Sequence, residues 1–125
     1  MNDDRQQRST IEIVREAEPV SLDHLDELAQ GMSGELVKAV VDIGEGIMAI
    51  GGMMHADEEA TLIDGGPRQT DLWGINLYPQ EHGTDDFVEF DSMINVRPGQ
   101  GNRSRSIEDP ATRAAILEMV DRLVK

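Results

Sequence analysis

The sequence predicts an α+β fold: a mostly antiparallel sheet of four or five strands, with two or three helices packed on it. Residues 36–50 and 71–96 each contain two apolar or alternating runs that flank a turn segment, which is the pattern of a β-hairpin. Three other segments combine helix start signals with apolar residues at helical spacing. The sequence contains no internal repeat or linker, which indicates a single domain over residues 11–125 after a disordered tail over residues 1–10.

The first elements are a short strand and a helix. Residues 11–15, Ile-Glu-Ile-Val-Arg, predict the strand. Ser21 is the expected N-cap of the helix, because its hydroxyl can accept a hydrogen bond from a backbone N–H of the first turn. Gly31 is expected to end the helix. The apolar stripe of this helix consists of Leu22, Leu25, Leu28 and Ala29.

The hairpin over residues 36–50 is expected to turn at Gly44-Glu45-Gly46. One face should carry Val37, Ala39, Val41, Ile43, Ile47 and Ala49, and the other should carry Val40, Met48 and Ile50. Because both faces are apolar, we expect this strand pair to be covered on both sides. Apolar residues left exposed on its outer face would indicate a homodimer. A short helix over residues 53–63 follows, with its acids in the first turn, where the helix dipole favours them.

The hairpin over residues 71–96 holds the only Trp, the only Tyr and both Phe residues. Alternation from residue 88 to residue 96 predicts a long second strand, paired across a loop over residues 79–86. The expected register sets Asn76 opposite Glu89 and Gly74 opposite Asp91. The less apolar face then collects Asn76, Tyr78, Glu89, Asp91 and Asn95. This set is either a solvated sheet face or part of a binding site.

A final helix is predicted after Asp109, the expected cap, with Pro110 at its first position. Its buried stripe is expected to consist of Ala114, Leu117, Val120 and Val124, supported by Ile116 and Leu123.

The charge of the chain excludes several classes of partner. The net charge is −14, which disfavours general nucleic-acid binding and binding to an anionic membrane surface.

The sequence has no cysteine, which excludes disulfides, thiolate catalysis and cysteine-ligated zinc. The sequence carries neither a signal peptide pattern nor a long apolar run, so a cytoplasmic location is expected.

One segment departs from this acidic background. Residues 92–107 contain three arginines and no acid. Within them, residues 97–105 form what we call the arginine loop, and its glycines allow backbone N–H groups to turn toward a ligand. Arginine forks bind carboxylate or phosphate in a bidentate manner. The candidate ligand-binding residues are Arg97, Gln100, Asn102, Arg103 and Arg105, with Asn76, Asn95, Glu89 and Asp91 nearby. The alternative is a structural loop whose arginines pair with the protein's own carboxylates, such as Glu89 and Asp91.

A second candidate is a divalent-metal site. On a helix, His55, Glu58 and Glu59 lie three and four residues apart and can face one ion. His82, Asp85 and Asp86 could add ligands from the neighbouring loop. The alternative is an ordinary acidic helix start. No catalytic residue is assigned.

Four motifs carry a resemblance to a known family: HADEE at 55–59, DLWGINLYP at 71–79, FDSMINVRPGQGNRSR at 90–105 and EDP at 108–110. The chain resembles an uncharacterised domain-of-unknown-function family of small bacterial and archaeal proteins. The resemblance covers about residues 11–124. It implies kinship and supplies no mechanism, cofactor or catalytic residue.

Two functions from different classes follow from these observations. The first is a small cytoplasmic binding or interaction module that recognises an anionic ligand or an acidic partner segment through the arginine loop. The second is a metal-assisted hydrolase acting on a phosphate-bearing substrate, with His55, Glu59 and Asp91 as ligands or base. The sequence leaves open whether the protein is an enzyme.

Overall fold

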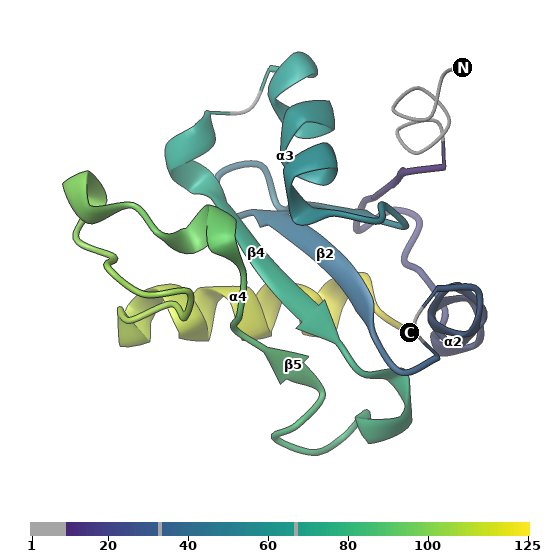
Figure 1. Ribbon diagram of the computed structural model, residues 1–125. Coiled ribbons are helices and arrows are strands. Elements are labelled where there is room, and N and C mark those ends of the chain that lie inside the picture. Colours follow the sequence, from purple (N-terminus) through teal and green to yellow (C-terminus); the bar gives the residue numbers. More distant parts are fainter. Residues whose placement is uncertain (1–9, 33, 67) are drawn as a thin grey trace.

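A computed structural model describes residues 10–32, 34–66 and 68–125 (Figure 1). The disordered tail predicted for residues 1–10 falls, except for Thr10, outside the described residues. The fold is α+β, as predicted, with a five-stranded antiparallel sheet in the order β1-β3-β2-β4-β5. The strands are β1 (Glu12–Val14), β2 (Val37–Asp42), β3 (Ile47–Ile50), β4 (Leu72–Leu77) and β5 (Val88–Glu89). The α-helices of the described part are α2 (Leu22–Gln30), α3 (His55–Asp64) and α4 (Pro110–Leu123).

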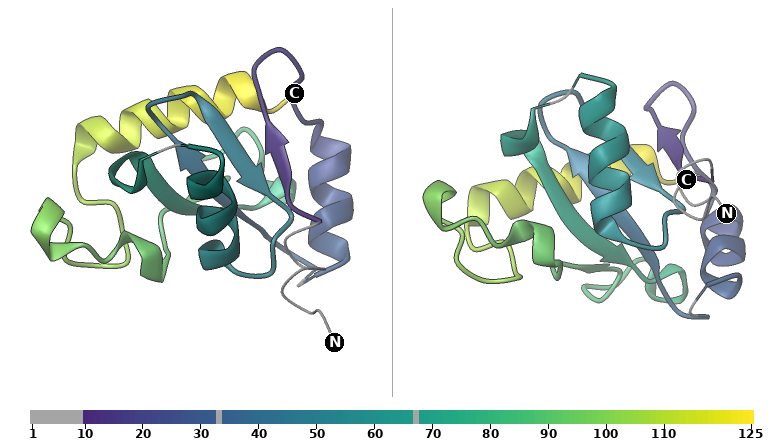
Figure 2. Two further views of the ribbon diagram at one scale, coloured as in Figure 1. Left: turned by 90° about the horizontal axis from the view of Figure 1, so that it is seen from above. Right: turned by 45° about the horizontal axis from the view of Figure 1, so that its top comes forward.

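The sheet lies between two unequal helical layers. The larger hydrophobic core joins one face of the sheet to α2 and α4, and the smaller one joins the opposite face to α3 (Figures 1 and 2). Backbone hydrogen bonds from Val20 to Leu123 and from Lys125 to Val20 fasten the C-terminal end of α4 beside the start of α2. Each helix of the described residues is too short or too polar to cross a lipid bilayer.

Helix α2 begins as the sequence predicts, with the hydroxyl of Ser21 accepting a hydrogen bond from the backbone N–H of His24. Helix α4 begins with Pro110 at its first position, also as predicted. The predicted stripe of α4 is partly wrong, because Ala114 and Leu117 are exposed. The helix has apolar residues on more than one side, and packing on the sheet selects the face that carries Ile116, Met119, Val120 and Leu123.

The register of the β2–β3 hairpin differs from the predicted one by one residue. Val41 pairs with Met48 and Ala39 with Ile50, so the turn spans residues 43–46 rather than 44–46. The prediction that Ile47 and Ala49 share the face of Val41 is therefore wrong, because a one-residue shift moves every side chain to the other face.

The expected cover on both sides of this hairpin is confirmed. On its outer face, Val40 and Ala49 are fully buried and pack against Leu62 of α3. The exposed apolar surface that would indicate a homodimer is thus not found at Val40 and Ala49.

The β4–β5 pairing confirms one half of the predicted register and corrects the other. Asn76 pairs with Glu89, as predicted. The long strand predicted up to residue 96 is wrong, because β5 ends at Glu89 and the chain folds into a 3-10 turn, η3 (Met93–Asn95). Ser92 starts that turn, and its hydroxyl accepts a hydrogen bond from the backbone N–H of Ile94. Gly74 pairs with Val40 of β2 on one side, and on the side of β5 it consequently has no strand residue opposite it.

Candidate functional site

The carboxamide of Asn95 occupies the place beside Gly74 that the missing strand would have filled. Asn95 Oδ1 accepts a hydrogen bond from the Gly74 N–H at 2.8 Å, and Asn95 Nδ2 donates to the Gly74 carbonyl at 2.9 Å. Asn95 is fully buried. A Cβ on Gly74 would lie 2.6 Å from both Cβ and Oγ of Ser92, so glycine is needed for this close approach. Asn95 thus seals the edge of β4 and is not available to a ligand.

Arg97 continues the same edge. Its guanidinium donates to the carbonyls of Gln69, at 2.5 Å, and Leu72, and its Cζ lies 4.1 Å from the centre of the Trp73 ring. Burial lowers the pKa of Arg97. Gln100 Nε2 makes a parallel contact with the carbonyl of Thr70 at 2.9 Å. Both side chains were predicted to bind a ligand, and both instead tie the arginine loop to the start of β4.

Asn102 sets the shape of the arginine loop from inside. Its Nδ2 donates to the carbonyls of Asn95, Ser104 and Ser106 at 2.7, 3.1 and 2.7 Å. Its Oδ1 accepts from the backbone N–H of Glu108 at 2.9 Å. The side chain is buried, and all its polar atoms are engaged within the protein. Asn102 therefore pre-organises the loop.

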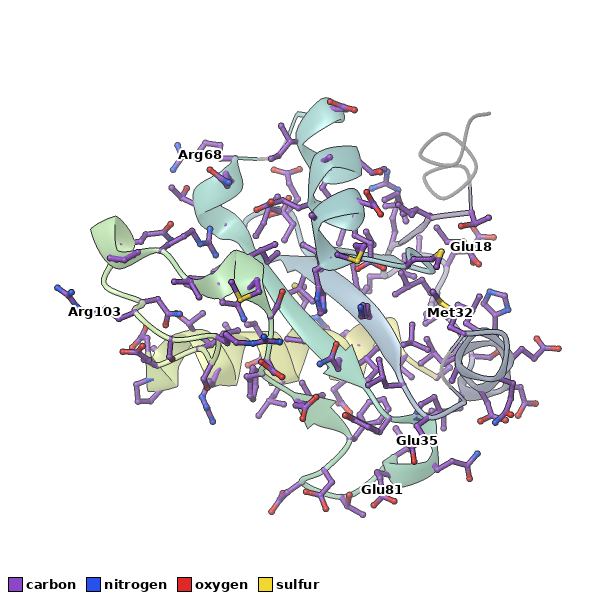
Figure 3. All side chains as sticks on the ribbon, in the orientation of Figure 1. Glu18, Met32, Glu35, Arg68, Glu81 and Arg103 are labelled. Atoms are coloured by element: carbon purple, nitrogen blue, oxygen red, sulfur yellow. The ribbon has the colours of Figure 1, made fainter. Side chains whose placement is uncertain are left out.

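Arg103 differs from Arg97, because its guanidinium is not bound to any of the described residues. It is exposed, its side chain extends away from the loop (Figure 3), and its guanidinium forms no hydrogen bond or ion pair with the described residues. The backbone beneath it is held in place, because the N–H groups of Arg103 and Ser104 both donate to Glu108 Oε2 at 2.9 Å. Hydrogen bonds from the Ser104 side chain and from these two N–H groups lower the pKa of Glu108. Arg103 is thus an exposed charge on a backbone segment that Glu108 holds in place.

Arg105 and Arg113 lie beside the loop in more engaged positions. Arg105 Nε pairs with Asp91 Oδ1 at 2.7 Å, and both side chains are about half exposed. Arg113, in the first turn of α4, lies over the Phe90 ring at 4.6 Å and donates to Ser106 Oγ at 2.7 Å. Arg113 was not among the candidate residues predicted from the sequence. Its distance from the loop along the chain gave no signal, and only the folded position of α4 places it there.

Part of the predicted polar set is assembled around Glu89, whereas Asn95 lies at the edge of β4 beside Gly74. Glu89 Oε1 accepts hydrogen bonds from Asn76 Nδ2 at 2.8 Å and from the Tyr78 hydroxyl at 3.0 Å. Burial and the hydrogen bond to the Glu89 carboxylate raise the pKa of Tyr78 to about 12. Asn76 Nδ2 also reaches the Asp91 carbonyl at 3.2 Å, whereas Asn76 Oδ1 has no donor among the described residues. These carboxylates make this face a poor place for an anion.

The three residues predicted as metal ligands each form a hydrogen bond with a different part of the protein. His55 Nε2 bonds to the Ile75 carbonyl at 2.8 Å, Glu58 Oε2 accepts from the Gly52 N–H at 3.0 Å, and Glu59 Oε2 accepts from Gln69 Nε2 at 3.4 Å. Burial lowers the pKa of His55 and raises that of Glu58 well above its usual range. In the part of the chain that is described, no three His, Asp or Glu side chains are grouped as a metal ion requires.

The additional ligands proposed from the loop after β4 also lie apart from His55. The His82 ring packs edge-on against Phe87, with 4.9 Å between the ring centres. Asp85 and Asp86 are exposed and line an acidic hollow of about 440 Å³ together with Tyr78 and Glu89.

A family model matches residues 12–123 of the chain, and its description is that of a protein of unknown function. This match confirms the resemblance to an uncharacterised family along nearly the whole chain. No curated protein and no solved structure matches the chain.

Proposed function

The chain belongs to DUF5674, a family of proteins of unknown function, and on that premise we propose that it is a binding module for an anionic group. The group is a phosphate or a carboxylate, carried by a small ligand or by an acidic segment of a partner. The arginine loop provides the contact, with Arg103 as its principal residue and Arg105 and Arg113 beside it.

The observation that supports this proposal is the contrast between Arg103 and its surroundings. Arg103 has an exposed guanidinium without a described ion pair, while the backbone that presents it is fixed by Glu108 and by the buried Asn102. A fixed loop loses little conformational entropy when it binds, so more of the interaction energy appears as affinity. Five N–H donors in a planar fork suit the oxygens of phosphate and carboxylate.

Arg105 is a second arginine that can bind the anion in this proposal, after it releases Asp91. A half-exposed ion pair such as Arg105–Asp91 contributes about 0–1 kcal/mol. An incoming anion can therefore compete with Asp91 for Arg105 at small cost. Four other side chains only hold the loop in place, because they donate hydrogen bonds to backbone carbonyls of the protein. They are those of Arg97, Gln100, Asn95 and Asn102.

Isothermal titration of the full chain with pyrophosphate and with a poly-glutamate peptide tests the proposal. We expect wild-type protein to bind at least one probe, and Arg103→Ala to weaken that binding by roughly tenfold or more, because a charge-assisted hydrogen bond contributes about 1.5–3 kcal/mol. The matched control is Arg122→Ala, which removes one positive charge from the far end of α4. Absence of binding to both probes, or equal loss in the two variants, would overturn the proposal.

The metal-assisted hydrolase is the second candidate, and one observation favours it. Burial lowers the pKa of His55, and the Asp91 carboxylate, which is paired to Arg105, opposes that shift. The Asp91 carboxylate that pairs with Arg105 therefore also acts on the charge of the His55 imidazole. Calorimetric titration with Mn²⁺, Mg²⁺ and Zn²⁺ tests this candidate, and it fails if none of the three ions produces binding heat.

A further inference from the structure

A cavity whose lining includes no residue of the arginine loop lies at the C-terminal end of α3. It has a volume of about 630 Å³ and opens between β1, the β2–β3 turn and the segment that leads into β4. Its apolar wall consists of Ile13, Ile47 and Leu62. A volume of this size fits a small organic molecule.

The cavity contains a buried acid with an unused acceptor. Asp42 is only 1% exposed, and its Oδ1 accepts hydrogen bonds from the N–H groups of Gly44 at 2.9 Å and Glu45 at 3.1 Å. Its Oδ2 has no donor among the described residues. A buried acceptor without a partner costs about 1–3 kcal/mol, and native structures normally provide one. A donor from a ligand would remove that cost.

Two further features make this end of the cavity attractive to a cation. Asp71 and Glu45 line it together with Asp42, and Oδ2 of Asp71 comes so close to Gly44 that a Cβ there would lie 2.6 Å away. Helix α3 directs its C-terminal end to the cavity, where Gly65 and Gly66 form part of the lining, and its last turn has no basic residue. The negative end of the helix dipole thus adds to the three carboxylates.

The same cavity is also lined by two arginines. They are Arg15, which directly follows β1, and Arg68, which precedes β4, and both are exposed. Neither guanidinium forms an ion pair with the described residues, although three carboxylates line the same cavity. The buried Asp42 and the exposed Arg15 and Arg68 thus line one cavity. The apolar part of the same lining consists of Ile13, Ile47 and Leu62.

We propose that this cavity binds a small zwitterion of the amino-acid type. Its ammonium group donates to Asp42 and Asp71, its carboxylate meets Arg15 and Arg68, and its aliphatic part lies against Ile13, Ile47 and Leu62. This site is separate from the arginine loop and does not depend on the function proposed for that loop.

The test is a thermal-shift and calorimetric screen of the full chain with the free L-amino acids and 5-aminopentanoate. Butylamine and pentanoate, which carry one charge each, serve as single-sign probes. At least one zwitterion should bind in the millimolar range or tighter and raise the melting temperature further as its concentration is increased above the Kd. Both single-sign probes should bind roughly tenfold more weakly, because each loses one charged contact. Failure of every zwitterion, or a single-sign probe that binds as tightly as the best zwitterion, would overturn the proposal.

Variants separate this site from the arginine loop. Asp42→Asn keeps the Oδ1 acceptor and removes the charge, and it should weaken zwitterion binding roughly tenfold, as should Arg15→Ala combined with Arg68→Ala. Asp121→Asn and the pair Arg122→Ala with Lys125→Ala are the matched controls, and they should bind as wild type does. The double arginine variant keeps the test decisive if Asp42→Asn does not fold. Unchanged affinity in folded Asp42→Asn or in the double variant contradicts the proposal.

Discussion

Asn95 and Gly74, 21 residues apart, are joined by two hydrogen bonds in which a side-chain carboxamide pairs with both backbone polar groups of a strand residue. This pair connects two of the sequence motifs, DLWGINLYP and INVRPGQGNRSR, into one structural unit. Replacing Asn95 with Ala leaves the N–H and the carbonyl of Gly74 buried without partners. We expect a loss of about 2–5 kcal/mol in the free energy of unfolding, since each such group costs about 1–3 kcal/mol. Urea denaturation measures it, with Met93→Ala, at an exposed site, as control. A loss no larger than that of the control would contradict this role.

Gly74→Ala should destabilise the protein through a steric clash with Ser92. The new Cβ would lie 2.6 Å from Cβ and Oγ of Ser92, which is too close for any real contact. We expect a loss of about 1–3 kcal/mol, the usual cost of overpacking. In a double-mutant cycle, Ser92→Gly should recover part of that loss, because it removes both clashing atoms. Strictly additive effects of the two changes would show that the clash lies elsewhere.

Arg97→Ala should loosen the packing around Trp73. The Arg97 guanidinium covers the indole ring, and Trp73 is the only tryptophan, so its fluorescence reports on this position alone. We expect stronger quenching by acrylamide and a lower urea midpoint. Arg103→Ala is the matched control and should change the free energy of unfolding by no more than about 0.5 kcal/mol, as exposed substitutions usually do. If both variants behave alike, Arg97 does not maintain the packing around Trp73.

Glu58→Gln should change how stability depends on pH. Burial raises the pKa of Glu58 well above its usual 4.5, so the folded protein holds the neutral acid where the unfolded chain ionises it. The stabilisation is complete below about pH 4.5 and is lost as the pH rises toward the folded pKa. Glutamine stays neutral, so the variant should gain stability over wild type as the pH rises above 4.5.

Urea midpoints measured across this pH range check the prediction for Glu58. Glu59→Gln, at the next and partly exposed position, is the control and should follow the wild-type curve. If the Glu58→Gln and wild-type curves are parallel, the carboxyl group is not neutral in the folded protein.

Much of the framework was predictable from short-range signals. Ser21 and Pro110 start their helices where the sequence indicates, and Asn76 faces Glu89 as the alternation predicts. The contacts of Asn76 and Tyr78 with Glu89 were also predictable, because residues that alternate on paired strands share a face. Each of these features depends on a few neighbouring residues or on one turn.

The sequence alone therefore determined the fold class, the acidic background and the position of an arginine-bearing loop. The tertiary structure decided which contacts the arginines make. Arg97 donates hydrogen bonds to the carbonyls of Leu72 and Gln69. Arg105 pairs with Asp91, and Arg103 remains exposed. The tertiary structure also decided the phase of α4 and the register of the β2–β3 hairpin. The physical reason is that side-chain contacts with distant backbone groups leave no periodic trace along the chain. Which of several apolar faces is buried depends on the partner that packs against it.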